Sequence, residues 1–303
     1  IRDVERSRGL GDVYKRQANL TQTLNTTPSF TFVSYSTTNS TYSCALYIDD
    51  TLHDENTSVQ NNTETTLTAN TSLSPGDHTW YINCTDSEGS WPSETRTIGI
   101  GANFSRCAVL VDSGTYYLNG SIINSSIPSC INIVANNVTL DCQGNTIDGN
   151  DSVNYGIIIN RSAEGTTNIT IRNCKIQDWY RGIYLYNANE NKLENITATS
   201  NNDYGIYLWR SSKNKFYLNN FINNTNSIYS YGSNNIWNSP SPLAYTYNGQ
   251  NFTNYMGNYW SDYGGSDKNG DGIGDTPYSN RDNYPLMEPW ENYFAPTPMH
   301  FDT

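Results

Sequence analysis

Apolar and polar residues alternate within short runs that recur at a nearly constant interval in the middle of the chain. The runs at 182–186 (GIYLY), 205–209 (GIYLW) and 227–231 (SIYSY) begin 23 and 22 residues apart, and 156–159 (GIII) begins 26 residues before the first. β-Branched and aromatic residues repeated at this period, between Asn, Ser and Gly, are typical of a β-solenoid. Because one coil cannot bury its apolar face alone, the pattern predicts coils stacked on one continuous core.

The alternation within each run predicts which side chains face inward. Successive side chains of a strand point to opposite faces, so Ile183, Ile206 and Ile228 are expected to lie above one another inside. Leu185, Leu208, Ile157 and Ile159 are assigned to the same interior. With coils about 4.8 Å apart, the outward residues form two aromatic columns: Tyr184, Tyr207 and Tyr229, beside Tyr186, Trp209 and Tyr231.

These two columns carry the main functional prediction, which is carbohydrate binding. Flat exposed aromatic side chains suit the apolar faces of sugar rings, and a large exposed apolar patch on a soluble protein usually has a partner. Two alternatives stay open. The N-terminal domain or the C-terminal segment of the chain covers the patch, or the stacked rings only strengthen the sheet.

The composition favours an all-β fold. With 303 residues the chain has room for two domains, and its 24 Tyr with many β-branched residues argue against disorder. The hydrophobic fraction is only 36% and the charged fraction 15%, while Asn is plentiful. Amides at equivalent positions of stacked coils form ladders, so abundant Asn fits a solenoid.

The net charge excludes several classes of partner. A formal charge of −12 and a pI near 4.5 oppose binding to nucleic-acid phosphates and to anionic membrane surfaces. No run of 18 or more apolar residues occurs, so no membrane span is expected.

The first 17 residues, IRDVERSRGLGDVYKRQ, differ in composition from the rest of the chain. They are rich in Arg and acids, whereas the next segment is rich in Asn and Thr. The string resembles the translated sequencing-adapter sequence found at the ends of metagenomic gene models, so we leave residues 1–17 out of the fold prediction. Removing five basic and three acidic residues changes the net charge from −12 to −14.

The cysteines and the glycosylation sequons favour an extracellular or cell-surface location. None of the six cysteines forms a C-x-x-C pair, which disfavours zinc and suits disulfides in an oxidising compartment. About seventeen N-x-S/T sequons, from Asn19 to Asn251, agree with a glycoprotein, although an Asn- and Thr-rich chain also produces them by chance. The six cysteines are Cys44, Cys84, Cys107, Cys130, Cys142 and Cys174.

Residues 18–101 are predicted to form a small β-sandwich. Cys44 and Cys84 lie 40 residues apart in apolar runs, as in the inter-sheet bridge of immunoglobulin-like domains. Ile82 replaces the Tyr usual two residues before the second Cys, and no Trp follows the first Cys at the usual distance. The segment therefore fits an immunoglobulin or fibronectin type III relative, with a spacer or adhesion role.

Residues 102–238 are predicted to form the parallel β-helix, and 239–303 a C-terminal cap. Cys107 and Cys130 flank the entry, where a bridge would protect bare strand edges. Cys142 and Cys174 end equivalent runs, NNVTLDC and NITIRNC, and are either bridged or two buried free thiols.

The repeats and the C-terminal sequence resemble a known group of proteins. The resemblance rests on NNVTLDCQGNTIDG, NITIRNCKI, the GIYL runs, NKFYLNNFINN and the ending GNYWSDYGGSDKNGDGIGDTPY…DNYPLM. With these motifs the chain resembles archaeal surface proteins with NosD-like repeats. The resemblance covers roughly residues 105–290. It implies a right-handed parallel β-helix of a type associated with carbohydrate binding and sugar hydrolysis. NosD itself is linked to copper-enzyme maturation.

We do not expect copper binding, because the soft and imidazole ligands are scattered. Copper favours imidazole and sulfur ligands. The three His and three Met form neither a ladder nor a close pair in sequence: His53, His78, His300, Met256, Met287 and Met299.

A calcium-type loop is predicted at 267–275 (DKNGDGIGD). Oxygen ligands at positions 1, 3 and 5, Gly at position 6 and a backbone carbonyl at position 7 follow the calcium-loop pattern. The loop is similar to thrombospondin type 3 and dockerin loops, and no flanking helices are apparent. Tyr278 replaces the acid at position 12, where Asp282 is a substitute. The predicted ligands are Asp267, Asn269, Asp271, Ile273, Asp275 and Asp282. The alternative is a hydrated turn without metal.

Catalysis on the helix is the second functional hypothesis. A glycoside hydrolase needs paired carboxylates, and a lyase needs calcium with Arg or Lys. The candidates are Asp178, Asp203, Arg181 and Arg210, although Asp178 and Asp203 precede their glycines by unequal distances. A solvated rim of mixed charges is the simpler interpretation.

The sequence thus predicts an exported, non-catalytic surface protein that is structural or binds a glycan or envelope component. The alternatives are a polysaccharide hydrolase or lyase, and a purely architectural stalk of a larger surface protein.

Overall fold

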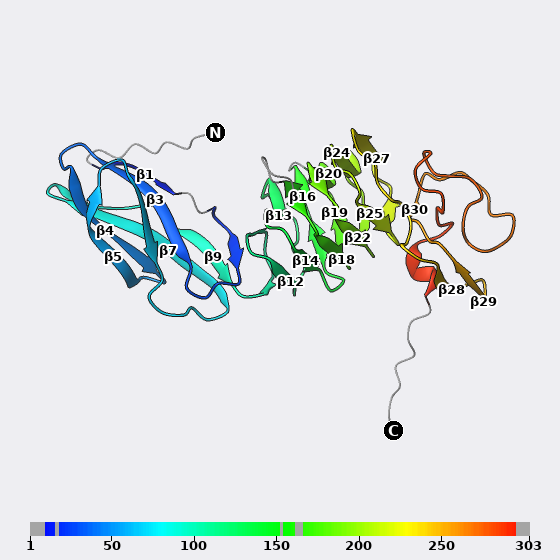
Figure 1. Ribbon diagram of the computed structural model, residues 1–303, viewed down its shortest axis with the longest axis horizontal. Coiled ribbons are helices and arrows are strands. Elements are labelled where there is room, and N and C mark those ends of the chain that lie inside the picture. Colours follow the sequence, from blue (N-terminus) through cyan, green and yellow to red (C-terminus); the bar gives the residue numbers. More distant parts are fainter. Residues whose placement is uncertain (1–9, 16–17, 152–153, 161–165, 295–303) are drawn as a thin grey trace, which may run out of the picture. The chain divides into compact units, whose positions relative to one another are not determined.

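The computed structural model describes residues 10–15, 18–151, 154–160 and 166–294. The chain forms two compact units. The first contains residues up to Phe104 together with 108–111, and the second contains 105–107 and the residues from Asp112 onward. Apart from the 3₁₀ helix η1 (Trp290–Tyr293), the regular elements of the described residues are β-strands, which confirms the all-β prediction (Figure 1).

The first unit contains two sheets around one core. One sheet has the antiparallel order β1 (Leu10–Lys15), β3 (Ser29–Ser36), β6 (Glu64–Thr68). The other has the order β11 (Ala108–Leu110), β2 (Thr21–Thr23), β9 (Arg96–Ile100), β7 (Gly76–Asp86), β4 (Thr41–Ile48), β5 (Thr51–Gln60). β8 (Gly89–Pro92) pairs with β7, and β10 (Asn103–Phe104) is a further short strand.

Alternate residues of the two sheets meet in the core of this unit. Phe30 of β3 packs on Trp80 of β7 with ring centroids 4.5 Å apart, and both belong to the apolar cluster that holds the Cys44–Cys84 disulfide. β2 pairs in parallel with both β9 and β11, so this sheet is not purely antiparallel. Of the adapter-like segment, residues 10–15 form β1, which pairs with β3, and the others lie outside the described residues.

The second unit is a parallel β-helix in which successive coils contribute strands to three parallel sheets (Figure 1). The sheet that carries the predicted columns, here called the aromatic sheet, consists of β13 (Ser129–Ile133), β16 (Tyr155–Asn160), β20 (Arg181–Tyr186), β24 (Tyr204–Trp209) and β27 (Asn226–Tyr231). Within this unit the second sheet contains β12 (Gly114–Leu118), β14 (Val138–Asp141), β18 (Thr170–Arg172), β22 (Lys192–Glu194) and β25 (Lys215–Tyr217). The third consists of β15 (Thr146–Asp148), β19 (Lys175–Gln177), β23 (Thr197–Thr199), β26 (Asn220–Ile222) and β30 (Tyr259–Trp260).

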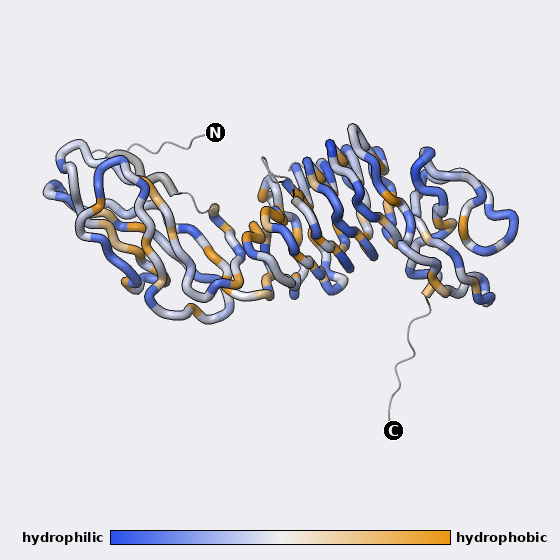
Figure 2. Tube along the Cα trace, viewed as in Figure 1, coloured by the Kyte–Doolittle hydropathy of each residue, from blue (hydrophilic) through white to orange (hydrophobic). Residues whose placement is uncertain are grey.

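The interior of the helix is the predicted one. Ile183 pairs in register with Ile206, and Ile206 with Ile228, so the repeat at 23 and 22 residues corresponds to one coil. Ile183 and Ile206 are buried, and Ile228 is partly exposed in the last strand of the sheet. Figure 2 shows apolar stretches recurring from coil to coil between polar stretches.

Disulfides join neighbouring coils near the start of the helix. Cys107 is bonded to Cys130, and Cys142 to Cys174, so all six cysteines are paired as three bridges. The second bridge settles the alternative that the sequence left open. β17 (Thr166–Thr167) and β21 (Ala188–Asn189) form one further short parallel pair.

The 239–303 segment belongs to the same unit as the helix. Its strand β30 pairs in parallel with β26 and continues the third sheet. β28 (Leu243–Tyr247) and β29 (Gln250–Asn254) form a hairpin whose rings pack with Tyr293 of η1. No helix among the described residues is long and apolar enough to cross a membrane.

Candidate carbohydrate-binding face

The register of the aromatic sheet brings the predicted outward residues into two columns. Tyr184 pairs with Tyr207, and Tyr207 with Tyr229. Tyr186 pairs with Trp209, and Trp209 with Tyr231. In the preceding coil the equivalent positions hold Ile158 and Asn160, and Ile158 pairs in turn with Asn132 of β13. Because these strands pair without a register shift, equivalent residues of every coil point the same way.

The rings of the columns contact one another directly. Tyr207 and Tyr229 stack with centroids 4.4 Å apart, and Trp209 and Tyr231 stack at 4.5 Å. Tyr184 meets the edge of Tyr207 at 5.3 Å. Aromatic pairs of this kind contribute about 0.5–1.5 kcal/mol each beyond the area they bury, so the face also strengthens the sheet.

A third outward column, which the sequence analysis missed, widens the face. It contains Tyr155, Arg181 and Tyr204 at paired positions of successive coils. Tyr155 stacks on Tyr184 at 4.9 Å, and Tyr204 meets Tyr207 edge-on at 5.4 Å. Each of these residues stands immediately before the Gly of its run. Strict alternation would place them inside, but the Gly and the Ile after it are both buried, so the residue before the Gly faces outward.

The one cation in the described strands of this face is held by both a carboxylate and a ring. Arg181 Nε donates to Asp203 Oδ2 at 2.9 Å, and the guanidinium carbon lies 3.8 Å from the centroid of the Tyr207 ring. Burial opposes the charge, but the hydrogen bond and attraction from Asp203 raise the pKa of Arg181 above its ordinary value. Arg181 therefore stays protonated.

The columns are partly open to solvent. Tyr231 is 51% exposed, and Tyr184, Tyr207 and Trp209 are partly exposed, as expected for rings that cover each other's faces. Burial, followed by the charge of the neighbouring Tyr155, raises the pKa of Tyr184 to about 12. Among the described residues, the ring and cation contacts of the two columns involve no residue of the 240–290 segment.

Close packing behind the aromatic sheet fixes its position. A Cβ on Gly205 would lie 2.7 Å from Asn224 Nδ2, and one on Gly182 would lie 2.9 Å from Asn201 Nδ2. Asn201 and Asn224 form a ladder in which Asn201 Nδ2 donates to Asn224 Oδ1 at 2.8 Å. Glycine is required at these positions because the backbone approaches the ladder more closely than any side chain permits.

A second ladder ends on a buried acid. Asn219 Nδ2 donates to Asn258 Oδ1 at 2.9 Å, and Asn258 Nδ2 donates to Asp282 Oδ2 at 3.1 Å. Asp282 is fully buried and also accepts from Trp260 Nε1 at 3.0 Å and from the backbone N–H of Tyr284 at 3.0 Å. Burial raises the pKa of Asp282 to about 6, against these hydrogen bonds, which lower it.

Asp282 therefore has a structural role that the sequence did not indicate. The prediction made it a substitute ligand of the calcium-type loop, but its carboxylate is directed at Asn258, Trp260 and Tyr284.

Within the calcium-type loop, positions 1, 3 and 5 converge. Asp267 accepts from the backbone N–H groups of Gly270 and Gly272 at 2.8 and 2.7 Å, and Asn269 Nδ2 donates to Asp271 Oδ2 at 3.1 Å. Asp275 Oδ2 accepts from the backbone N–H of Lys268 of the same loop at 2.9 Å. No group of three or more His, Cys, Asp or Glu side chains suited to a metal occurs in the described part of the chain.

The catalytic candidates are not gathered into one acid pair. Asp203 binds Arg181, whereas Asp178 lies against Asp148 of the preceding coil. Burial, then the hydrogen bond with Asp148 and repulsion by it, raise the pKa of Asp178. The backbone N–H of Asp203 bonds to the carbonyl of Tyr180, so Asp203 is offset from Asp178 and does not stack on it. Arg210 is exposed in a left-handed turn with φ 49°.

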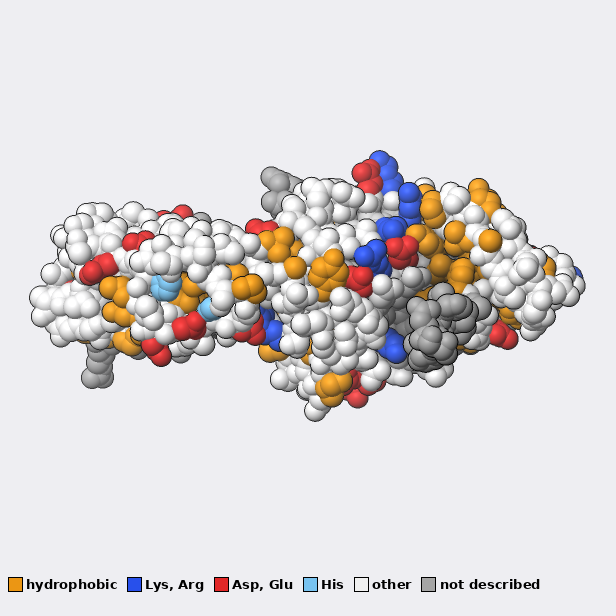
Figure 3. Space-filling view, turned by 90° about the horizontal axis from the view of Figure 1, so that it is seen from below, with side chains coloured by type: hydrophobic (Ala, Val, Ile, Leu, Met, Phe, Trp, Pro, Cys, Tyr) orange, Lys and Arg blue, Asp and Glu red, His pale blue; other side chains and the backbone are white. Residues whose placement is uncertain are grey.

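The second sheet presents a different, charged surface. Arg172 Nε lies 2.9 Å from Asp141 Oδ2, and Lys192 Nζ lies 2.7 Å from Glu194 Oε1. Figure 3 shows acidic and basic side chains next to one another over the helix. Such pairs are typical of a solvated face and each contribute about 0–1 kcal/mol.

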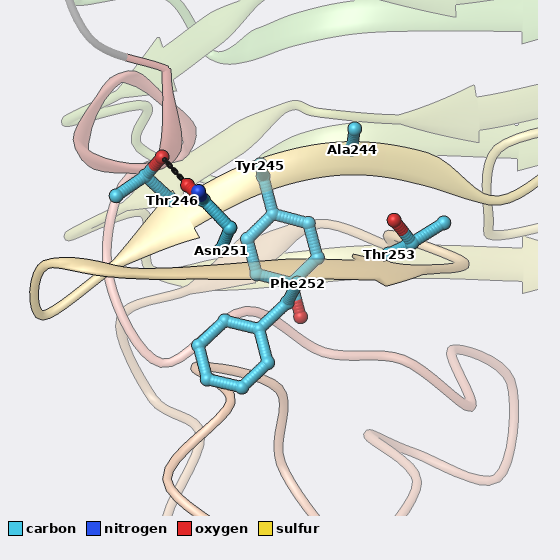
Figure 4. Close-up of a pocket in the computed structure, with 6 residues that line it drawn as sticks. All are labelled: Ala244, Tyr245, Thr246, Asn251, Phe252 and Thr253. Atoms are coloured by element: carbon cyan, nitrogen blue, oxygen red, sulfur yellow. Dashed lines mark hydrogen bonds between the residues drawn. The ribbon is translucent and has the colours of Figure 1, made fainter.

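A shallow depression of about 430 Å³ lies on the β28–β29 hairpin (Figure 4). Across its floor Thr246 Oγ1 donates to Asn251 Oδ1 at 2.9 Å. Tyr245 is buried and its hydroxyl donates to the carbonyl of Asp271, so this ring fixes the hairpin on the calcium-type loop.

Comparisons with known proteins found one family model and two solved structures. The family model described as periplasmic copper-binding protein (NosD) matches residues 37–265. Two solved structures resemble the chain at low sequence identity and low TM-score. Pectate lyase Pel3 from Pectobacterium carotovorum is 12% identical with TM-score 0.27, over 75% of this chain and 83% of that one. Pectate lyase PelI from Erwinia chrysanthemi, in complex with tetragalacturonic acid, is 11% identical with TM-score 0.26, over 86% of each chain. No curated protein matches the chain.

For the metal named in the family's description, the described residues offer no group of three or more His, Cys, Asp or Glu side chains that could hold it. All six cysteines are in disulfides, and His78 is bonded to Asp49 at 2.6 Å and to the carbonyl of Ser74 at 2.9 Å. Met256 is fully buried in the apolar cluster of the C-terminal segment. His300 and Met299 lie outside the described residues. The family match nevertheless spans well over half of the sequence, and the chain belongs to the NosD family.

Proposed function

We propose that this protein is an exported, non-catalytic β-helix module that binds a polysaccharide of the cell surface or envelope through the aromatic sheet. The observation that carries the proposal is the face itself. Three outward columns bring Tyr184, Tyr207, Tyr229, Trp209 and Tyr231 together with Tyr155 and Tyr204 on one sheet. The stacked rings leave their edges and the 51% exposed Tyr231 for apolar contact with sugar rings, and the hydroxyl groups of Tyr supply hydrogen bonds.

The arrangement of the charged residues supports binding without turnover. Glycoside hydrolysis needs two carboxyl groups on either side of the scissile bond, but Asp203 is paired with Arg181 and Asp178 faces Asp148. A lyase needs a base to abstract a proton, and Arg181 is held protonated by Asp203.

Three disulfides support an oxidising compartment outside the cytoplasm. Several sequons have a structural explanation. Asn137 and Asn168 occupy left-handed corners with φ 56° and 58°, and Asn168 Nδ2 donates to Asn137 Oδ1 at 2.7 Å. The sequence N-V/I-T at these corners places Asn at the turn, an apolar residue inside and Thr outside. Glycosylation is therefore proposed for the exposed sequons of the first unit, such as Asn19 and Asn70.

Binding to a panel of immobilised polysaccharides tests the proposal. Tyr231→Ala removes a ring that is 51% exposed within the columns, and the matched control Tyr35→Ala removes a ring that is 44% exposed in the first unit. We expect Tyr231→Ala and Trp209→Ala to weaken binding about tenfold or more, which corresponds to about 1.4 kcal/mol, while Tyr35→Ala binds like the wild type.

Two results would contradict the proposal. Release of reducing or unsaturated sugars that is lost in Asp203→Asn would make the protein an enzyme. If the folded protein binds none of the polysaccharides, the remaining interpretation is the purely architectural stalk.

A further inference from the structure

The chemistry of the aromatic face also defines the class of polysaccharide. We infer that the face binds an unbranched, uncharged polysaccharide whose chain runs along the columns, in preference to a polyuronate. This inference rests on the proposed function and concerns the same site.

The described strands of the face contain no free positive charge to receive a sugar carboxylate. Among the outward positions of β16, β20, β24 and β27, Arg181 is the only charged residue. Its Nε is bound to Asp203, and the two side chains are only 18% and 19% exposed. Its guanidinium lies over the Tyr207 ring at 3.8 Å. The charge is therefore neutralised within the face before any ligand arrives.

The rest of the molecule disfavours a polyanion as well. The chain has a formal net charge of −12, and like charge slows and weakens the approach of an acidic polymer, most strongly at low salt. A neutral sugar chain does not meet this repulsion. It gains apolar contact with the parts of the rings that stay exposed, above all Tyr231, and hydrogen bonds to Tyr hydroxyls.

The columns also give the site a direction. Along one column Tyr184, Tyr207 and Tyr229 follow at centroid distances of 5.3 and 4.4 Å, one ring per coil. A chain that lies along the column meets a ring at each coil, so each added sugar gains a contact until the face is covered. A branched chain would lift its backbone off the rings. Affinity should consequently rise with the length of a linear oligosaccharide.

Titration calorimetry of the full chain tests this directly. The probes are neutral cello-, manno- and N-acetylchito-oligosaccharides of two to eight units, and oligogalacturonate and oligoalginate of the same lengths, each at low and high NaCl. We expect binding of at least one neutral series, an affinity that rises with length, little change with salt, and binding of the acidic series at least about tenfold weaker. Acidic oligomers that bind equally well or better, or neutral binding that does not depend on length, would overturn the inference.

Asp203→Asn is the informative variant, because it removes the partner of Arg181 while the guanidinium remains. We expect this variant to gain affinity for oligogalacturonate at low salt, severalfold or more, and to lose the gain at high salt. An unchanged preference, in a variant with a wild-type melting profile, would show that the ion pair does not set the selectivity. Failure of the proposed function looks different, because then no oligosaccharide of either series binds to wild type or variant.

Discussion

The buried Asn ladder of the β-helix makes a quantitative prediction for Asn214→Ala. Asn214 is fully buried, and its Oδ1 accepts from the backbone N–H and from Nδ2 of Asn191, both at 2.9 Å. Its Nδ2 donates to the carbonyl of Ala188 and to Oδ1 of Asn235, both at 3.0 Å. The substitution removes all four bonds at once, and the Ala side chain cannot replace any of them.

The magnitude follows from the hydrogen bonds that are lost. Three groups each lose a hydrogen bond in a dry interior. They are the backbone N–H and the Nδ2 of Asn191, and the carbonyl of Ala188. An unsatisfied buried polar group costs about 1–3 kcal/mol, so with partial relaxation we expect a loss of about 3–5 kcal/mol. The free energy of unfolding of a typical domain is about 5–15 kcal/mol. The variant should therefore unfold at a much lower urea concentration.

The assay is urea unfolding followed by far-ultraviolet circular dichroism, together with hydrogen exchange of the peptides from β20 to β25. The matched control is Asn234→Ala. Asn234 is an exposed residue of the next coil, and its backbone forms hydrogen bonds with Ser212 Oγ and with the backbone N–H of Lys213. We expect the control to change the free energy of unfolding by less than about 0.5 kcal/mol. A loss below about 1 kcal/mol for Asn214→Ala would refute the reasoning that amide ladders hold the coils together.

Two further predictions concern the C-terminal part of the second unit. Burial raises the pKa of Asp282 from its ordinary 3.8 to about 6, so the folded state binds this proton more tightly than the unfolded state does. Its contribution to stability is full at low pH and falls by about 3 kcal/mol as pH rises from about 4 to about 6. Melting curves of wild type and Asp282→Asn at each pH check this, since parallel profiles would exclude the effect. For the calcium-type loop, we expect chelation to lower the melting temperature of calcium-loaded wild type but not of Asp267→Ala. An unchanged wild-type transition would remove calcium from the account.

The periodic part of the fold could be predicted because every stacked coil pairs with the next in the same register. Ile183, Ile206 and Ile228 recur at the coil length, and strand alternation then decides that Tyr184, Tyr207 and Tyr229 face outward. The equivalent runs NNVTLDC and NITIRNC predict that Cys142 and Cys174 lie near each other, and both follow the paired strands β14 and β18. The bridge itself depends on a backbone spacing that the sequence does not contain.

The contacts of residues outside the repeat could not be predicted, because they depend on where the corners of each coil place those residues. Asp282 meets Asn258 and Trp260 because the chain returns to the end of the helix after the calcium-type loop. Arg181 and Asp203 belong to consecutive coils, and only the register of β20 and β24 shows that they pair. Asp178 and Asp203 lie at unequal distances before Gly182 and Gly205, and the two acids do not stack in the structure.

Hydroxyl-radical footprinting in the presence of a bound polysaccharide tests most directly whether the aromatic sheet is the binding surface. We expect protection of Tyr184, Tyr207, Trp209, Tyr229 and Tyr231, and unchanged labelling of Tyr35 in the first unit. Protection confined to the hairpin at Tyr245 and Phe252 or to the first unit, with the columns labelled as in the free protein, would contradict the account.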